Sequence, residues 1–225
     1  MNEKKITVLI ADDHMVVREG LRKLLDAEQD IEVIGEAANG RTAVDMTVTL
    51  HPDVVVMDIA MPQMNGLEAT RQIRKVVPKA RVIILSAHSD DAYVEGVMTL
   101  GANGYLIKQS SAHVLSEAIR EVQNGNVFFS PDIAKRFKKR KQKTLDRNGM
   151  SKAIHLSSRE LEVLQQIAEG EANKKMAANL GISIKTIEKH REHLMSKLDI
   201  HDTAGLTRYA IATGIVENSV QLTIL

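Results

Sequence analysis

The 225-residue chain contains no cysteine and no tryptophan, and aromatic residues make up only 3% of it. The lack of cysteine excludes disulfides, thiol catalysis and cysteine-ligated zinc, and it fits a reducing compartment. Because aromatic side chains are scarce, aliphatic side chains and methionine must fill the core. Apolar residues make up 44% and charged residues 26%, which is the composition of an ordinary globular protein.

Long apolar runs are also missing from the start of the chain. The first run, residues 6–11, is followed at once by Asp12 and Asp13. It is too short for the core of a signal peptide or for a membrane span. We therefore expect a cytoplasmic protein that does not bind a membrane.

The net charge of +1 hides three zones of different charge. Residues 1–125 carry 13 Lys and Arg against 18 Asp and Glu, residues 126–150 carry 8 against 2, and residues 151–225 carry 9 against 9. Such shifts in charge favour separate segments. We predict an acidic domain at 1–125, a basic linker at 126–153 and a second domain at 154–225.

The first domain alternates between strand-like and helix-like segments. Apolar runs begin near residues 6, 31, 54, 81 and 104, and several are almost continuous, as in parallel strands that are covered on both faces. The segments between them have helical spacing. This alternation predicts an α/β doubly wound sheet of five parallel strands with right-handed crossovers.

Polar side chains follow four of these strands. Asp12 and Asp13 end the first strand, Asp58 the third, Ser86 the fourth and Lys108 the fifth. Taken singly, an aspartate here could cap the next helix or shape a turn. Because ligands bind at the carboxyl ends of the strands in such sheets, we expect these groups to form one site.

These residues lie in the motifs "ADDH" (11–14), "VVVMDIAMPQMNG" (54–66), "ILSAHSD" (84–90) and "GANGYLIK" (101–108). With these motifs, residues 5–125 resemble the receiver domain of two-component response regulators. The resemblance implies a flavodoxin-like strand order, 2-1-3-4-5, and a phosphoryl group accepted by Asp58. It further implies that Asp13, Asp58 and the carbonyl of Ala60 hold Mg²⁺, with Asp12 assisting through water. Ser86 and Lys108 would bind the phosphoryl oxygens, and Tyr105 would change position on activation.

The chemistry of these residue types agrees with that role. Mg²⁺ prefers oxygen ligands, and it would reduce the repulsion between a carboxylate nucleophile and a phosphoryl group. A lysine and a hydroxyl stabilise the additional negative oxygens. One position departs from the family pattern, because Gln109 follows Lys108 where many receivers have proline. A cis peptide bond is therefore less secure there.

Seven of the nine residues at 135–143 are basic, which favours a solvated linker, although such a run can also contact phosphates. From residue 156 onwards the pattern is helical. Ser157 and Glu160 form a capping-box pattern. A short helix at 173–181 that ends at Gly181 and a longer helix at 183–198 have the layout of a helix-turn-helix, within an all-α domain of four helices.

The third helix carries an inner stripe of Ile184, Ile187, Leu194 and Leu198 together with Arg191. Residues 154–219 resemble the LuxR-type DNA-binding domain, and its pairing with a receiver is similar to the NarL/FixJ class. The resemblance implies phosphate contacts and base contacts to double-stranded DNA, the latter from the start of the third helix. The candidate phosphate contacts are Asn173, Lys174, Thr186 and Arg191, and the candidate base readers are Lys185, Glu188, Lys189 and Glu192.

The sequence therefore predicts a DNA-binding transcription factor that is switched by phosphorylation of Asp58 from a sensor histidine kinase. The resemblance also implies a homodimer on DNA that forms through the last helix, residues 202–214. A Mg²⁺-dependent phosphohydrolase with an aspartate nucleophile is the alternative, but it needs a second aspartate at the position of Ala60. A nucleotide or flavin carrier is disfavoured because the loop at 11–14 is acidic.

Overall fold

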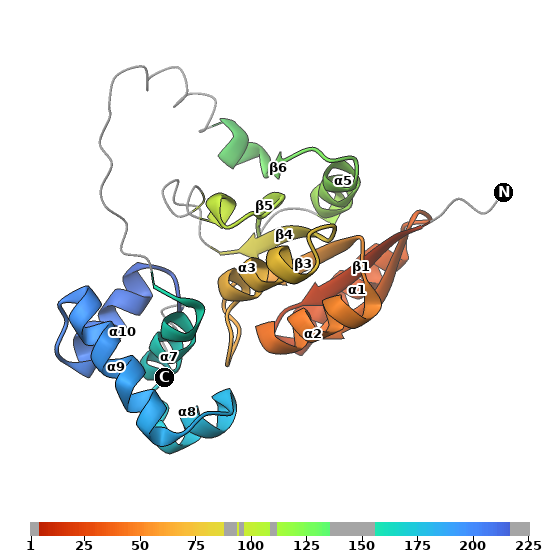
Figure 1. Ribbon diagram of the computed structural model, residues 1–225. Coiled ribbons are helices and arrows are strands. Elements are labelled where there is room, and N and C mark those ends of the chain that lie inside the picture. Colours follow the sequence, from red (N-terminus) through yellow and green to blue (C-terminus); the bar gives the residue numbers. More distant parts are fainter. Residues whose placement is uncertain (1–4, 88–93, 95–96, 109–111, 136–155, 217–225) are drawn as a thin grey trace, which may run out of the picture. The chain divides into compact units, whose positions relative to one another are not determined.

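The protein is described by a computed structural model, which covers residues 5–87, 94, 97–108, 112–135 and 156–216 (Figure 1). The chain divides into two compact units, residues 1–151 and 152–225, which we describe separately. Residues 90–93 and 95–96 of the segment at 90–102, which has helical spacing, lie outside the described residues, as does most of the basic run at 135–143. Among the described helices, none combines the length and the apolar character that a bilayer crossing requires.

The first unit is a parallel sheet in the order β2-β1-β3-β4-β5-β6. The predicted order of the first five strands is confirmed, and the structure adds β6 at the edge, within the segment that we predicted to be linker. The strands are β1 (Ile6–Ala11), β2 (Ile31–Ala37), β3 (Val54–Asp58), β4 (Arg81–Ser86), β5 (Gly104–Ile107) and β6 (Phe128–Phe129).

Helices cover both faces of this sheet (Figure 1). The described helices are α1 (Met15–Asp26), α2 (Gly40–Leu50), α3 (Gly66–Val76) and α5 (Ala112–Gln123). Alternate residues of β3 enter two different cores: Val55 packs with residues of α2 and α3, whereas Val56 packs with residues of α1 and α5. All five residues of β3 are buried, which explains its unbroken apolar sequence.

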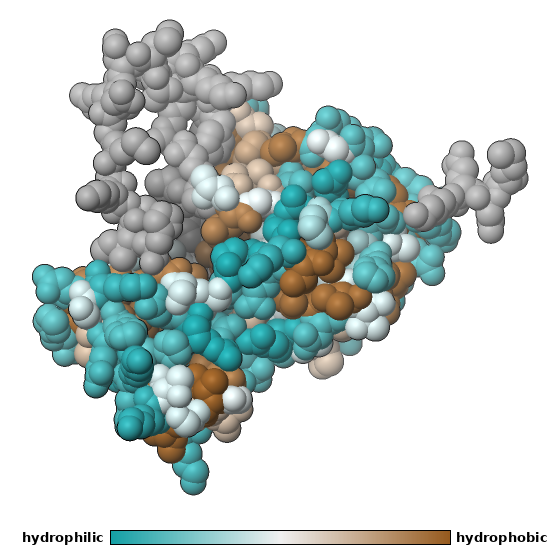
Figure 2. Space-filling view, viewed as in Figure 1, coloured by the Kyte–Doolittle hydropathy of each residue, from teal (hydrophilic) through white to brown (hydrophobic). Residues whose placement is uncertain are grey.

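The second unit consists of α7 (Ser158–Ala168), α8 (Asn173–Leu180), α9 (Ile184–Leu198) and α10 (Thr203–Ala212) around a separate aliphatic core. The predicted capping box is confirmed at the start of α7, where the side chain of Ser157 and that of Glu160 bond to each other's backbone N–H. In Figure 2 the visible face of each unit is mainly hydrophilic, with smaller hydrophobic patches, as expected when most apolar residues enter these cores.

Glu160 also joins two helices of the second unit, because Nζ of Lys197, near the end of α9, lies 2.7 Å from its Oε2. Burial raises the pKa of Glu160, but the hydrogen bonds from Lys197 and Ser157 outweigh burial and leave this pKa below its ordinary value of 4.5. A carboxyl group whose pKa is lower in the folded state stabilises the fold above its unfolded pKa. That stabilisation is lost as the pH falls through the folded pKa.

We expect Glu160→Gln to lower the free energy of unfolding of the second unit by about 1 kcal/mol at pH 7, because the cap and the ion pair are both weakened. The difference from wild type should shrink as the pH falls from 4.5 through the lowered pKa of folded Glu160, below which wild-type Glu160 is also neutral. Hydrogen exchange of the full-length protein in urea, followed on peptides of α7 and α9, measures this unit separately. The exposed Glu188 provides the control Glu188→Gln. A pH-independent difference would contradict the prediction.

Candidate functional site

The register of the sheet brings the predicted polar residues together at its carboxyl edge. Ala11 of β1 pairs with Met57 of β3, so the residues that follow them, Asp12 and Asp58, lie side by side. Asp58 itself pairs with Leu85, which precedes Ser86 in β4. The side chains of Asp12 and Asp58 are 1% and 0% exposed, and Ser86 is fully buried. Three neighbouring strands therefore deliver polar groups to one buried place.

Lys108 joins the two buried carboxylates. Its Nζ lies 2.8 Å from Oδ2 of Asp58 and 3.1 Å from Oδ2 of Asp12. The lysine follows β5 directly, and its backbone N–H donates to the carbonyl of Ser86 at 2.8 Å. Burial lowers the pKa of Lys108, but the hydrogen bonds and charges of Asp58 and Asp12 outweigh burial, so the pKa is raised overall. The ammonium group therefore stays charged beside Asp58 at neutral pH.

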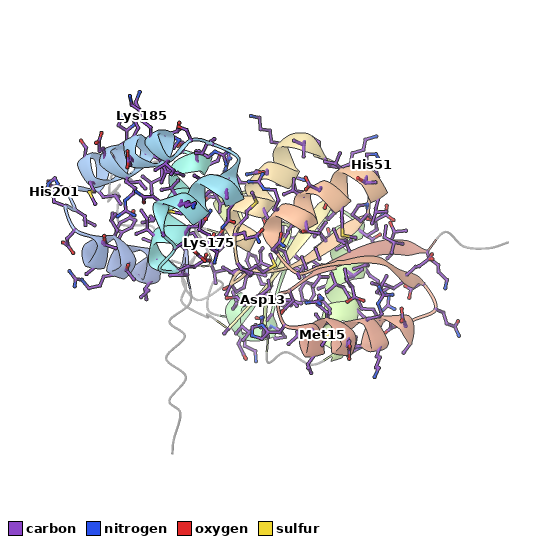
Figure 3. The ribbon with its side chains drawn as sticks, turned by 90° about the horizontal axis from the view of Figure 1, so that it is seen from below. Asp13, Met15, His51, Lys175, Lys185 and His201 are labelled. Atoms are coloured by element: carbon purple, nitrogen blue, oxygen red, sulfur yellow. The ribbon has the colours of Figure 1, made fainter. Side chains whose placement is uncertain are left out.

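Asp13 and His14 complete an acidic cluster at the beginning of α1. The ligand atoms of Asp12, Asp13, His14 and Asp58 all lie within 4.8 Å of one another. Figure 3 shows Asp13 and Met15 at one edge of the first unit. Apart from their ion pairs with Lys108 and His14, the buried atoms Oδ2 of Asp12 and Oδ1 of Asp13 accept no hydrogen bond among the described residues. Buried anionic oxygens of this kind fit a hard divalent cation, so the cluster can bind a metal.

Asp12 and Asp58 also make local hydrogen bonds of the kind that shape turns. Oδ1 of Asp12 accepts a hydrogen bond from the backbone of His14 at 2.9 Å, and Oδ1 of Asp58 accepts one from the backbone of Ile59 at 2.8 Å. In each case this bond uses one carboxylate oxygen, while the other faces Lys108. The turn interpretation and the functional interpretation are thus compatible, because each carboxylate has two oxygens.

Ala60 and Tyr105 are the other two residues that were predicted for this site. Ala60 is half-buried in the loop between β3 and α3. Tyr105 is fully buried in β5 and belongs to the core cluster that also contains Ile84 of β4 and Ile133. Among the described residues no peptide bond is cis. The bond between Lys108 and Gln109 lies outside them.

Sequence reasoning gave no role to Arg18 or to His14. Nη1 of Arg18, one turn into α1, donates to the carbonyl of Asp12 at 2.8 Å, and its Nε lies 3.4 Å from a carboxylate oxygen of Glu36. Arg18 therefore anchors the acidic loop to β2. The strand-end pattern could not reveal it, because the residue belongs to a helix. His14 could have been noticed from its position directly after the two aspartates.

In the second unit, α8 and α9 form the predicted helix-turn-helix. Gly181 ends α8 with a φ of 63°, which suits glycine, and Ser183 caps α9 by accepting a hydrogen bond from the backbone of Thr186. Lys185 points away from the helices of its unit (Figure 3). The other three candidate base readers are exposed as well: Glu188, Lys189 and Glu192.

The candidate phosphate contacts are less uniform. Lys174 is exposed at the start of α8, whereas Asn173 and Thr186 are half-buried. Nη2 of Arg191 donates to Oγ1 of Thr203 at 3.2 Å, so this arginine connects α9 with the beginning of α10.

One residue of the inner stripe was placed wrongly. Ile187, Leu194 and Leu198 are buried as expected, but Ile184 is 44% exposed. It is the first residue of α9 and lies almost one turn before Ile187, the first residue of this helix in the core. Helical spacing alone does not show where a helix leaves the core.

Both units match known protein families. Residues 8–120 match the response regulator receiver domain, and residues 155–210 match the luxR family of bacterial regulatory proteins. The transcriptional regulatory protein LiaR of Bacillus subtilis (strain 168) is 41% identical over 207 residues, which cover 91% of this chain and 96% of LiaR. DegU of Brevibacillus brevis, also a transcriptional regulatory protein, is 34% identical, with 96% of this chain and 98% of DegU covered.

A solved structure extends this likeness to the fold of nearly the whole chain. RcsB from Salmonella enterica serovar Typhimurium, bound to the promoter rprA in the presence of the phosphomimetic BeF3-, is 26% identical with a TM-score of 0.58. The match covers 92% of this chain and 98% of that one.

Proposed function

This chain belongs to the transcriptional response regulators that join a receiver domain to a luxR-family DNA-binding domain, and we propose that Asp58 is its phosphoacceptor. The observation that carries the proposal is the buried contact of 2.8 Å between Asp58 and Lys108, beside Asp12 and Asp13. A sensor histidine kinase is the proposed donor. The cytoplasm, where such a donor and DNA are both accessible, is the proposed location.

Asp58, Lys108 and Ser86 each have a different role in the proposed phosphoryl transfer. A carboxylate oxygen of Asp58 attacks the phosphorus of a phosphohistidine, and the P–N bond breaks with its electron pair left on the histidine nitrogen. Lys108 is held where it can neutralise the phosphoryl oxygens, and the buried hydroxyl of Ser86 offers them a hydrogen bond. When bound, Mg²⁺ supplies the positive charge that offsets repulsion between carboxylate and phosphate. We propose Asp13, Asp58 and the carbonyl of Ala60 as its ligands, with Asp12 acting through water.

The proposed output is binding of double-stranded DNA by α9 in a homodimer. The exposed start of α9 presents Lys185, Glu188, Lys189 and Glu192, and these side chains can read base edges in a major groove. The RcsB structure bound to a promoter supports this assignment by its similarity in fold. We further propose that α10 forms the dimer contact and that Asn173, Lys174, Thr186 and Arg191 contact phosphates.

The test measures binding to a DNA site selected from random sequence with the full-length protein, with and without acetyl phosphate and Mg²⁺. We expect tighter binding after phosphorylation, by about tenfold, which corresponds to a coupling of about 1.4 kcal/mol. Lys189→Ala should weaken binding in both states and relax the base preference, by about 1–3 kcal/mol at the base it reads. Lys79→Ala, on the exposed surface of the first unit, is the matched control.

Equal affinity in both states would contradict the phosphorylation switch but not DNA binding. Turnover of small phosphate esters is measured in the same samples. A phosphohydrolase would release phosphate from these esters repeatedly. The proposed regulator would show only slow self-dephosphorylation of phosphorylated Asp58, which is not evidence for an enzyme. Repeated release would favour the enzymatic alternative.

A further inference from the structure

The imidazole of His14 lies among the carboxylates of the receiver site. Its Nδ1 is 2.8 Å from Oδ1 of Asp13 and 3.3 Å from Oδ1 of Asp12. The backbone N–H of His14 donates to Oδ1 of Asp12 at 2.9 Å, so the residue is anchored beside these carboxylates. The side chain is 65% exposed and stands at the open side of the cluster.

The spacing of these atoms suits ligands that share one ion. Nitrogen and oxygen ligands lie about 2.1 Å from a transition metal ion, so two neighbouring ligands are roughly 3 Å apart. The separation of 2.8 Å between His14 and Asp13 is close to that value, and all four ligand atoms of the cluster lie within 4.8 Å of one another. Asp12 provides a second sign of a cation site: it is 1% exposed, and beyond the ion pair with Lys108 its Oδ2 accepts no hydrogen bond among the described residues.

We propose that His14 makes this edge a mixed nitrogen and oxygen site that coordinates a transition divalent cation through Nδ1. The inference rests on the metal-binding role proposed above for Asp13 and Asp58. Mg²⁺ takes oxygen ligands and keeps several waters, whereas Mn²⁺, Co²⁺ and Ni²⁺ also accept imidazole, and their affinity for such sites rises in that order. His14 therefore shifts the selectivity of the site toward transition metals.

A simpler role for the same contact is a hydrogen bond that only orients the carboxylate of Asp13. The two roles differ in one observable property. A ligand nitrogen transfers spin density from a paramagnetic ion to the imidazole, whereas an orienting nitrogen does not bind the ion. Pulsed electron paramagnetic resonance of bound Mn²⁺ detects this nitrogen coupling directly.

The experiment uses the full-length protein with one equivalent of Mn²⁺, and calorimetric titrations with Ni²⁺ and Mg²⁺. Nitrogen coupling is expected in wild type, lost in His14→Gln, and kept in His113→Gln, a control on the exposed side of α5. The ratio of Ni²⁺ affinity to Mg²⁺ affinity should fall about tenfold in His14→Gln. Asp13→Asn should weaken Mn²⁺ binding, because both residues bind the same ion.

Bound Mn²⁺ without nitrogen coupling in wild type would overturn the inference and leave the proposed phosphoacceptor site intact. Coupling that persists in His14→Gln would also overturn it, because another histidine would then hold the ion. If wild type bound neither Mn²⁺ nor Mg²⁺, the inference and the proposed metal-dependent function would fail together. Mg²⁺ binding thus separates failure of the inference from failure of the function.

Discussion

Asp58→Asn should abolish formation of an acid-labile phosphate on the protein. An amide oxygen is a poor nucleophile, and the amide carries no charge with which to hold a divalent cation. The fold should persist, because an asparagine side chain has the shape of the aspartate it replaces and Lys108 still has Asp12 at 3.1 Å. Intact-mass spectrometry after incubation with acetyl phosphate and Mg²⁺ measures the phosphorylated fraction, and circular dichroism checks the fold.

The matched control for this variant is Asp45→Asn, which removes an exposed carboxylate of α2 and should leave phosphorylation at the wild-type level. A phosphoryl group that still forms on the Asp58→Asn protein would place the phosphoacceptor elsewhere. Phosphorylation-dependent DNA binding should be lost together with the phosphoryl group, since both depend on the same carboxylate. If the Asp58→Asn protein carried no phosphoryl group but still bound DNA more tightly with acetyl phosphate, the DNA response would not depend on phosphorylation of Asp58.

Much of the receiver site could be predicted because parallel strands end at a common edge. Once the apolar runs were recognised as strands, the position of Asp58, Ser86 and Lys108 directly after them placed them together. The registers of β3 with β4 and of β4 with β5 agree with that expectation. The end of a strand can be recognised from local sequence, and in a parallel sheet the carboxyl ends of neighbouring strands lie side by side.

Other parts of the site depend on contacts that have no local signal. Arg18 reaches the carbonyl of Asp12 from a helix, and its spacing along the chain does not distinguish it from the exposed polar residues of α1. β6 has two residues and pairs only because the chain returns beside β5 after α5. The exposure of Ile184 depends on where the core of the second unit ends, and the apolar period of a helix does not contain that information.

A glycine at the start of α3 has a role that appears only in three dimensions. Gly66 is the first residue of α3 and lies against the backbone of Asp58. A Cβ on Gly66 would lie 1.9 Å from the carbonyl oxygen of Asp58 and 2.9 Å from the carbonyl carbon. The backbone N–H of Gly66 also donates to the carbonyl of Ile59 at 2.9 Å. The glycine thus allows α3 to begin in direct contact with Asp58, the proposed phosphoacceptor.

Gly66→Ala should therefore lower the free energy of unfolding of the first unit by about 3 kcal/mol, because the overlap is with backbone and rotation of a side chain cannot relieve it. In the folded fraction, the displaced Asp58 should accept phosphate from acetyl phosphate more slowly, by about two orders of magnitude for a shift near 1 Å. Urea unfolding and the initial rate of mass increase measure the two effects.

Gly20 provides a control with the same substitution and the opposite expected sign. It lies in α1, and a Cβ placed there would meet no atom within 4 Å. Gly20→Ala should stabilise the first unit by up to about 1 kcal/mol, because alanine favours the helix, and it should not slow phosphorylation. Equal effects of the two substitutions would show that the contact between Gly66 and Asp58 does not position the phosphoacceptor. Opposite effects would show that Gly66, which contacts the backbone of Asp58, positions this residue.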